Sequence, residues 1–524
     1  MNRENNIRNL NLNNIWDIVV IGGGATGLGV AVDAASRGYK TVLVEQHDFA
    51  KSTSSRSTKL VHGGVRYLGQ GDVALVLDAL KERGIFLKNA AHLVSKQEFV
   101  IPNYEWWDAP YYTIGLKIYD LMSGKKGFGT SEHISKAEAM EKIPNLLEKE
   151  LGGGVVYYDG QFDDSRMAIT LAQTINDKGG IAINYMRVNN LIRNRSGMIK
   201  GVKMTDMETG IEHKVNARVV VNATGIFSDN IIRMDDPVAE KKVIASQGVH
   251  LVVDKKFLGS SSALMIPKTS DGRVLFAVPW HDKTILGTTD TPVEEISLEP
   301  RAMEEEIQFI LDTCKQYLKI SPERKDVLSV FAGLRPLVAP EKEDKKTKEI
   351  SRDHTLSVSL SGLVSIVGGK WTTYRKMGED TIDTAIMVGG LKERPSVTSE
   401  MPLHASVVGN DEDDHLNFYG SDAMKIRAIV ADNPKMGERI VENYPFLKAE
   451  IVWACHHEMA RTLEDFLARR IRLLFMDARA AIKASTVVAK IMAAELGYRR
   501  KWQKEQIEIF GKLAEGYFLS EKPD

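Results

Sequence analysis

Short apolar runs that end in glycine turns mark the beginning of the chain. Residues 16–21 are apolar and rich in β-branched side chains, and three glycines follow at 22–24. This pattern predicts a buried parallel strand that enters a tight turn. Residues 25–37 are rich in alanine and predict a helix that stops at a glycine, and residues 40–45 predict the next strand. The chain is therefore expected to open with a strand–helix–strand unit.

Apolar residues at helical or alternating spacing continue through the first 400 residues. Helices are predicted at 72–91, 167–178, 300–318 and 372–388. Strands are predicted at 218–221, 249–253, 274–278, 284–287, 355–359 and 363–367, with an antiparallel sheet between 243 and 290 and a final hairpin. Near residue 400 the pattern changes, and helices without a convincing strand follow to 518. We expect an α/β protein with an all-α C-terminal part.

Composition and charge exclude several classes of protein. The 524 residues are 43% hydrophobic, and 69 Lys and Arg stand against 70 Asp and Glu, for a net charge of −1. A nucleic-acid-binding protein usually carries a basic excess, so we expect no nucleic-acid partner. Cys314 and Cys455 have no metal-site or redox-motif spacing, so we expect reduced thiols and no bound metal.

Hydrophobic segments typical of membrane insertion or export are not found in the sequence. The Asn-rich residues 1–14 lack the apolar region of a secretory signal, and no apolar run reaches about 18 residues. We therefore expect a cytoplasmic protein whose contact with a membrane is peripheral.

Gly22, Gly24 and Gly27 form a GxGxxG pattern between the first strand and the first helix. Gly22 permits a tight turn, Gly24 has no Cβ to obstruct a pyrophosphate, and Gly27 lets the helix pack closely on the strand. The helix N-terminus offers N–H groups and a positive dipole end to the diphosphate. Glu45 ends the second strand, where it can bind a ribose 2′-OH and disfavour a 2′-phosphate. The segment predicts a site for FAD or NAD rather than NADP.

Two later segments favour FAD over NAD. Asn222-Ala-Thr-Gly225 follows a buried strand, and Gly368-Gly369 follows the strand at 363–367. Both resemble further FAD contacts of flavoenzymes, with Gly225 and Gly369 as cofactor-binding residues. A simple NAD dehydrogenase needs neither segment, so we expect FAD as the cofactor.

The most specific stretch is residues 54–68, SSRSTKLVHGGVRYL. Gly287-Thr-Thr-Asp290, Gly333-Leu-Arg-Pro336 and the residues 368–375 follow it in order. In these motifs, from about 16 to 376, the chain resembles FAD-dependent, quinone-linked glycerol-3-phosphate dehydrogenases. The resemblance implies a glutathione-reductase-like FAD-binding domain of Rossmann type, interwoven with a mixed β-sheet substrate domain, plus an all-α C-terminal cap domain.

The change of pattern and the resemblance together divide the chain. We expect a body at 1–400 and a helical C-terminal domain at 401–524. Within the body, the FAD segments are about 16–70, 215–230 and 360–380, and the substrate segments are about 71–214 and 231–359.

The reaction that the resemblance implies is oxidation of sn-glycerol 3-phosphate at C2 to dihydroxyacetone phosphate, with hydride transfer to FAD and electron transfer to a quinone. By resemblance, the substrate pocket is lined by Arg66, Tyr67, Arg335 and Lys370. An arginine fork and a lysine suit a phosphate dianion. His62 is the candidate base for the C2 hydroxyl proton, because imidazole titrates near neutral pH, although a structural role for it stays open. Arg335 is the second catalytic candidate, since it can stabilise a developing alkoxide.

The same stretch supplies candidate cofactor contacts. By resemblance, Ser54, Ser55, Thr58 and Lys59 donate to the FAD diphosphate or to the flavin, with Lys59 offsetting negative charge. Gly64 allows the backbone to come close to the flavin ring.

Residues 104–121 are dense in Trp and Tyr, and Lys117, Lys125 and Lys126 lie nearby. These residue types suit a helix at the lipid headgroup level, and a quinone acceptor gives such a helix a purpose. We therefore expect peripheral contact with the cytoplasmic, inner face of the cell membrane; the alternative is a helix that caps the core. Arg469-Arg-Ile-Arg472 is interpreted as a helix face, with contact to acidic lipid as the alternative.

Other readings of the sequence stay open. An α-glycerophosphate oxidase would keep the fold and use oxygen, and another FAD-dependent oxidase of the superfamily would change the substrate. The chain has no obvious internal insertion of the kind expected for the first, and its clustered Arg and Lys argue against an amine or amino-acid oxidase. A non-catalytic flavin-binding protein is a third reading. The identity of the base, a homodimer and the role of the C-terminal helices also stay open.

Overall fold

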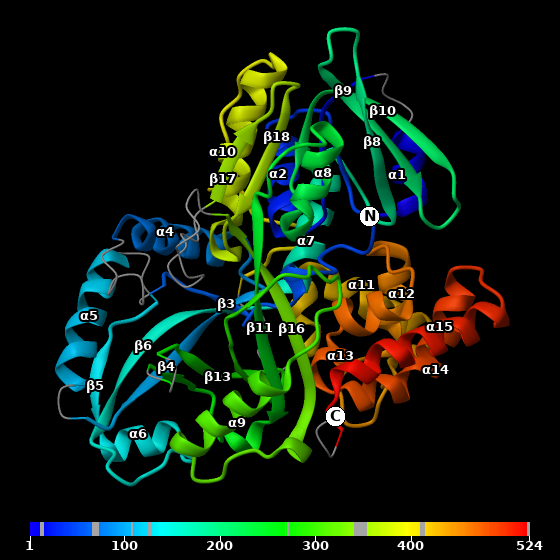
Figure 1. Cartoon of the computed structure of the whole chain (residues 1–524). Coiled ribbons are helices and arrows are strands. Elements are labelled where there is room, and N and C mark those ends of the chain that lie inside the picture. The colour runs from blue at the N-terminus through cyan, green and yellow to red at the C-terminus, as the bar shows by residue number, and fades with distance from the viewer. Residues whose placement is uncertain are drawn as a thin grey trace.

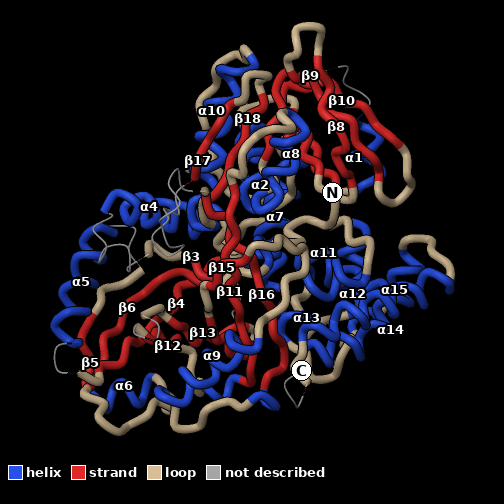
Figure 2. Tube along the Cα trace, in the orientation of Figure 1, coloured by secondary structure: helices blue, strands red, loops and turns tan. Residues whose placement is uncertain are grey.

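A computed structural model gives the fold of the chain (Figure 1). It describes residues 1–10, 15–64, 73–105, 108–123, 128–267, 269, 272–339, 354–408 and 414–520. Within these residues, two β-sheets form a body and a group of helices packs at its side (Figures 1 and 2). The arrangement confirms the α/β class with a helical C-terminal region.

The first sheet has a parallel centre built from buried Val and Ile. Its described strands run in the order β17-β18-β10-β1-β2-β7, with β17 antiparallel at the edge. Their bounds are β1 Trp16–Ile21, β2 Thr41–Val44, β7 Ile181–Ile183, β10 Glu212–Asn222, β17 His354–Val358 and β18 Leu363–Gly368. Two further strands, β8 (Met186–Arg193) and β9 (Ile199–Asp206), continue antiparallel from β10. Because both faces are covered, the buried parts of the central strands are mostly Val, Ile and Leu.

Helices on the two faces of this sheet bury alternate residues of β1. Ile18 and Val20 share a core with α2 (Ala25–Ser36), α7 (Asp164–Asp177) and α10 (Tyr374–Gly389). Val19 and Ile21 point to the opposite face, where α1 (Arg3–Leu10) and α8 (Ser228–Asp235) pack. Neighbouring residues of a strand point to opposite faces, so one short strand supplies two cores.

The second sheet is mostly antiparallel and contains the longest strands. Its described strands run β15-β11-β14-β13-β12-β4-β6-β3, with β16 paired to β11 and β5 to β6. Their bounds are β3 Leu60–Val61, β4 Val94–Asn103, β5 Glu132–Ser135, β6 Gly153–Phe162, β11 Val243–Asp254, β12 Ala263–Ile266, β13 Leu275–Trp280, β14 Lys283–Gly287, β15 Thr291–Val293 and β16 Val327–Val338. The pairing of β11 with β16 sets Ser246 opposite Arg335.

Four described helices that precede residue 320 pack against this second sheet. They are α4 (Val73–Asn89), α5 (Asp108–Ser123), α6 (Lys136–Lys142) and α9 (Glu304–Tyr317). Ile307 and Ile310 of α9 share a core with Val249 and Leu251 of β11. In Figure 1, α4 and α5 lie at the outer side of the sheet, far from the C-terminal helices.

The C-terminal helices share their apolar core with the second sheet. They are α11 (Ala423–Asp432), α12 (Lys448–His457), α13 (Leu473–Met476), α14 (Ala478–Glu495) and α15 (Arg500–Ala514). Phe466 and Phe475 pack in one cluster with Trp280 and Phe331 of the sheet. The C-terminal region is therefore joined to the body by a continuous core, and the domain boundary near residue 400 stays a prediction.

The C-terminal arginines do not form an exposed helix face; they are Arg469, Arg470 and Arg472. The alternative prediction, that they contact acidic lipid, is therefore wrong. All three side chains are buried. Arg469 donates to Asp48 Oδ2 at 2.6 Å, and Arg470 donates to the same oxygen at 2.8 Å. Asp48 follows β2, so the C-terminal arginines pair with a carboxylate from the first part of the chain.

Several element boundaries differ from the sequence-based prediction, and two of these differences have a local reason. The strand predicted at 218–221 is the end of β10, which begins at Glu212 because its first half, polar at the exposed positions and apolar at Val215, pairs with β9. The helix predicted from 300 begins at Glu304, where Glu306 accepts a hydrogen bond from the Met303 N–H at 3.1 Å. Among the described residues, every helix is too short or too polar to cross a bilayer.

Candidate active site

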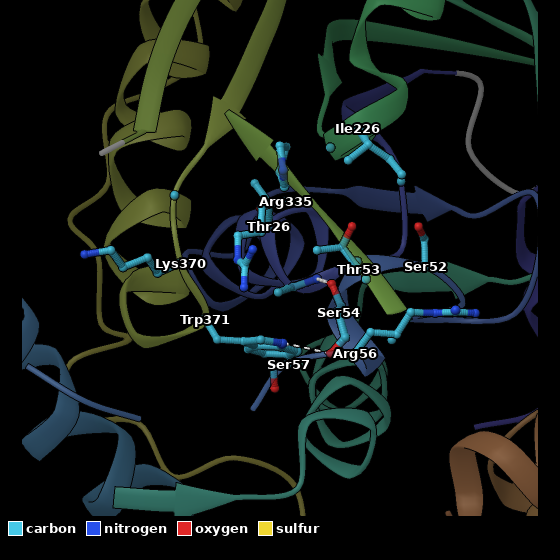
Figure 3. A pocket seen from close by; sticks show the side chains of 18 of the residues that line it. Thr26, Ser52, Thr53, Ser54, Arg56, Ser57, Ile226, Arg335, Lys370 and Trp371 are labelled. Carbon is cyan, nitrogen blue, oxygen red and sulfur yellow. Dashed lines mark hydrogen bonds between the residues drawn. The ribbon is translucent and has the colours of Figure 1, made fainter. Parts of the chain in front are cut away.

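A cavity of about 530 Å³ lies where the two sheets meet. Its wall comes from segments that are far apart in the sequence: the turn after β1, the residues after β2, the segment 52–58, strands β11 and β16, and the turns after β10 and β18. Figure 3 shows Thr26, Ser54, Arg335 and Trp371 around this space. A volume of this size is typical of ligand and cofactor sites.

The N-terminus of α2 opens directly into the cavity. Gly24, Ala25 and Thr26 line the wall, and Gly24 caps the helix without a side-chain hydrogen bond. Ala25 N donates to the Ser54 hydroxyl at 2.9 Å. Gly27 lies behind the wall, where a Cβ would come within 1.9 Å of Gly22 O, so only glycine allows the helix to pack against the turn. The result is a positive helix end suited to a diphosphate.

Glu45 lines the cavity beside this turn. Its Oε2 accepts from Gly23 N at 2.7 Å and its Oε1 accepts from His47 N at 2.9 Å. Burial raises the pKa of Glu45, although the two backbone N–H groups oppose the shift. The carboxylate thus fixes the glycine turn and keeps lone pairs for a ribose hydroxyl.

Ser54 and Thr58 line the cavity as the sequence predicts, but Ser55 and Lys59 lie behind its wall. The Ser55 hydroxyl is buried and donates to Ala50 O at 2.6 Å. Lys59 is fully buried, and its Nζ lies 2.6 Å from Asp164 Oδ2. Burial lowers the pKa of Lys59 to about 8, although Asp164 opposes the shift. The expectation of direct cofactor contacts from these two side chains is therefore corrected, because both are bonded on the far side of the segment.

Arg335 projects from β16 into the cavity and is held by the 287–290 segment (Figure 3). Its Nη1 donates to Asp290 Oδ1 at 3.1 Å, and its Nη2 donates to Thr288 Oγ1 at 3.2 Å. A Cβ at Gly248 would lie 2.4 Å from Arg335 Nη2, so the glycine in β11 makes room for the guanidinium. The sequence motifs at 287–290 and 333–336 thus form one unit.

The remaining candidate residues fall into two groups. His62, Gly64, Gly225, Gly369 and Lys370 line the cavity. Lys370 reaches it from the turn after β18, and its side chain extends away from Arg335 (Figure 3). Arg66 and Tyr67 lie outside the described residues.

Sequence reasoning missed two residues that the structure brings into the wall. His250 of β11 lines the cavity, and its Nε2 lies 2.9 Å from Thr58 Oγ1. Burial lowers the pKa of His250 well below its usual value, and Lys59 and Arg335 lower it further, so the ring is neutral. Trp371 donates its indole N–H to Ser54 O at 2.9 Å (Figure 3). The sequence did offer a signal for His250, because it is a polar residue within the apolar strand predicted at 249–253. For Trp371 the sequence offered no signal other than its position in the 368–375 motif.

These residues fit FAD. The open N-terminus of α2 suits the diphosphate, and Glu45 suits the ribose at one end of the wall. At the other end, Gly368 and Gly369 line the cavity, and Gly369 packs so closely on Met377 that a Cβ would lie 2.4 Å from its Sδ, so the turn after β18 needs glycine there.

Comparison with known proteins supports this fit. Residues 17–375 match the family described as FAD dependent oxidoreductase, and residues 364–506 match the C-terminal domain of alpha-glycerophosphate oxidase. The human "Glycerol-3-phosphate dehydrogenase, mitochondrial" is 40% identical over 545 residues, which cover 98% of this chain and 75% of the human protein. A Caenorhabditis elegans protein called "Probable glycerol-3-phosphate dehydrogenase, mitochondrial" is 40% identical over 538 residues, which cover 97% of this chain and 74% of that protein.

A solved structure is also similar over the whole chain. The glycerol-3-phosphate dehydrogenase from Bacillus halodurans, complexed with FAD, superimposes with a TM-score of 0.80 at 29% identity, and covers 100% of this chain and 99% of the other.

Proposed function

This chain belongs to the family of FAD-dependent glycerol-3-phosphate dehydrogenases, and from that premise we propose that it oxidises sn-glycerol 3-phosphate to dihydroxyacetone phosphate and passes the electrons to a quinone. FAD is the cofactor, and when bound it accepts the hydride from C2 of the substrate. The observation that carries the proposal is Arg335, a fixed guanidinium in the same cavity as the helix end that suits the diphosphate.

Arg335 and Lys370 are the proposed anchors for the substrate, together with Arg66 and Tyr67. A phosphate dianion needs cations that stay in place, and both Nη groups of Arg335 are held, Nη1 by Asp290 and Nη2 by Thr288 and by the backbone carbonyl of Thr289. Lys370 supplies a mobile charge from a different segment. We propose that Arg335, fixed at the cavity wall, selects a small phosphorylated alcohol over an uncharged one, and that the flexible Lys370 side chain turns toward the phosphate when the substrate binds.

The proton of the C2 hydroxyl needs a base close to the cavity, and three histidines line it, namely His47, His62 and His250. His47 lies beside Glu45, at the end of the wall assigned to the ribose, which leaves the other two as candidates. His62 lines the cavity from the segment between β3 and Gly64, and we assign it as the base. His250 faces the same space, but its Nε2 is already engaged with Thr58 Oγ1. We therefore assign His250 to holding the Thr58 segment and the substrate, and Arg335 to stabilising the developing alkoxide.

The outer face of α5 supports peripheral contact with the inner face of the cell membrane. Ile114 and Leu121 are 63% and 82% exposed, and Ile118 lies between them on the same face of the helix. Leu116 and Tyr119 are buried on the opposite face. Lys117 is exposed beside the apolar residues, as suits a helix that lies among anionic headgroups. Trp106 and Trp107, which belong to the same aromatic segment, lie outside the described residues.

An oxidase that uses oxygen is the second candidate function, because the match of residues 364–506 is to a domain of alpha-glycerophosphate oxidase. The substrate and the cavity would be the same in both cases. Only the electron acceptor differs, so measuring which acceptor is reduced in solution distinguishes the oxidase from the dehydrogenase.

The test has two stages. Purified protein is mixed anaerobically with sn-glycerol 3-phosphate, and loss of the visible flavin absorbance is expected; unchanged absorbance would overturn the substrate assignment. In the second stage, turnover is measured with either a short-chain quinone or oxygen as the electron acceptor. In both stages glycerol 1-phosphate replaces the substrate as the matched negative control. Turnover with quinone and little peroxide supports the dehydrogenase, and one peroxide per substrate oxidised would instead show the oxidase.

A further inference from the structure

The cavity-lining segment Ser54–Thr58 is held from behind by a buried group of charges. Lys59 Nζ donates to Ser55 O at 2.9 Å and to Ser57 O at 3.0 Å. Asp164, at the start of α7, accepts from Lys59 Nζ at 2.6 Å and from the Ser57 hydroxyl at 2.7 Å. The segment therefore presents one side to the cavity and is bonded on the other.

Arg472 brings the C-terminal region into this group. Its Nη2 donates to Ser55 O at 2.9 Å and to Asp164 Oδ1 at 2.9 Å. Its Nη1 donates to the Ser165 hydroxyl at 2.6 Å, and that hydroxyl donates to Ser55 Oγ at 2.7 Å. One guanidinium thus connects the segment, the start of α7 and the helix α13.

The surroundings make this connection rigid. The Arg472 side chain is 1% exposed, and its guanidinium lies 4.3 Å from the ring centre of Phe475. Lys59 Nζ lies 5.1 Å from the ring centre of Phe331 and 5.7 Å from that of Phe475. Buried charges that lose one partner become costly, so every member of such a group is held by the others.

The segment in turn sets the geometry of both ends of the cavity wall. Ser54 accepts from Ala25 N, the first residue of α2, and its carbonyl accepts from Trp371. Thr58 is hydrogen-bonded to His250. A shift of this segment would therefore move the diphosphate end and the substrate end together.

We propose that Arg472 is a positioning residue for the FAD site, and that the C-terminal helical region acts as the rear support of the cofactor-binding segment. The proposal rests on FAD binding in this cavity and goes beyond the reaction assigned above. On this proposal, the C-terminal region stabilises the cofactor-binding segment. The Arg472 guanidinium takes the place of water behind the backbone of Ser54–Thr58. A lysine at the same position could keep the charge but not bridge Ser55 O and Ser165 Oγ at once.

The test compares two arginines of the C-terminal region that both reach the body. Arg472→Met removes the support of the segment. Arg461→Met removes an ion pair of similar kind, 2.7 Å from Nε to Glu208 Oε1, that ends away from the cavity. For each holoenzyme the visible circular dichroism of the bound flavin and the rate of FAD release on dilution are measured, together with thermal unfolding.

We expect Arg472→Met to release FAD about tenfold faster, the size expected for losing one charge-assisted hydrogen bond, and to change the flavin dichroism. Arg472→Lys is expected to fall between this variant and wild type. Arg461→Met is expected to lower the unfolding temperature only, with wild-type FAD release.

Ser165→Ala keeps every charge and removes one bridging hydroxyl, so it keeps the test decisive if Arg472→Met does not fold. It should shift FAD release and dichroism in the same direction by a smaller amount. Wild-type dichroism and FAD release in Ser165→Ala, and in Arg472→Met where it folds, would overturn the proposal. None of these readouts uses glycerol 3-phosphate or quinone, so their outcome is independent of the proposed reaction.

Discussion

The guanidinium of Arg335 and the carboxylate of Asp290 lie 3.1 Å apart, from Nη1 to Oδ1, at the wall of the cavity. Asp290 also accepts from the hydroxyl of Ser246, the residue opposite Arg335 in the β11–β16 pairing. Two sequence motifs separated by more than a strand and a helix therefore meet as one charged unit. The hydrogen bonds of this unit fix the orientation of the Arg335 side chain, since an arginine without them would sample several rotamers.

Asp290→Asn is expected to raise the KM for glycerol 3-phosphate about tenfold and to lower kcat less. The amide can still accept a hydrogen bond but no longer fixes the guanidinium by charge, a loss of about 1.4 kcal/mol. Steady-state kinetics at matched FAD content measures the split, and Arg335→Ala serves as the more severe comparison, with sharply reduced turnover. A wild-type KM in Asp290→Asn would show that Asp290 does not orient the substrate anchor.

His62→Ala is expected to lower kcat at least about 100-fold with FAD retained, the usual loss for a general base. His250→Asn is expected to raise KM more than it lowers kcat, because His250 holds Thr58 rather than taking the proton. The measurement is the pH dependence of kcat and kcat/KM in both variants. If His62→Ala turns over like wild type, while His250→Asn loses the acidic limb of the profile, where the base becomes protonated, the two roles are exchanged.

The double variant Ile114→Ser with Leu121→Ser is expected to lose most binding to anionic vesicles. Each exposed aliphatic side chain contributes roughly 1.5–3 kcal/mol when it enters an apolar phase. Met424→Ser on α11, where Met424 is 74% exposed, is the matched control and should bind like wild type. Vesicle flotation measures the bound fraction, and unchanged binding after the double substitution would count against α5 as the docking helix. Trp106→Ser with Trp107→Ser extends the test to the aromatic segment.

His404 is expected to make stability depend on pH in the alkaline range. Its Nδ1 lies 2.7 Å from Asp177 Oδ2 and its Nε2 lies 2.8 Å from Asp422 Oδ2. Burial alone would lower the pKa of His404, but the hydrogen bonds to both carboxylates outweigh it and raise the pKa to about 9. Because the folded pKa is above the unfolded value, the stabilisation is complete below about pH 6.5 and is lost as the pH rises through 9.

Urea unfolding between pH 6 and 10 measures this effect. We expect wild type to lose about 1–2 kcal/mol relative to His404→Gln over this range, a figure reduced for solvent screening. The Gln variant should be less stable at pH 6 and follow a flatter curve. Parallel curves for the two proteins would exclude His404 as the source of the pH dependence.

Gly27→Ala is expected to yield protein without FAD. The added Cβ would lie 1.9 Å from Gly22 O, so the N-terminus of α2 must move away from the turn that binds the diphosphate. Gly511→Ala in α15 is the matched control: nothing lies within 4 Å of its Cβ, and alanine there should be neutral or stabilise by up to about 1 kcal/mol. Visible absorbance after purification measures bound FAD, and a fully loaded Gly27→Ala protein would contradict the close-packing argument.

Local patterns were enough to predict the opening of the chain as a dinucleotide site, whereas the choice of FAD over NAD also needed the segments at 222–225 and 368–369. The strand–turn–helix from Trp16 to Ser36 depends on neighbouring residues only, because the strand is buried on both faces and the turn needs glycine at Gly22 and Gly27. Arg335 was singled out by the family resemblance of residues 333–336, and its residue type agrees with phosphate binding without any knowledge of what lies opposite.

Only the tertiary structure decided which side of a segment each residue faces. Ser54 and Lys59 belong to one short motif, yet Ser54 lines the cavity and Lys59 points to Asp164 behind it. The buried arginines at 469–472 and the neutral His250 were missed for the same reason. Asp48 lies 421 residues from Arg469, and Thr58 lies 192 residues from His250. The state of a buried charge depends on such distant partners, which its neighbours in the chain do not reveal.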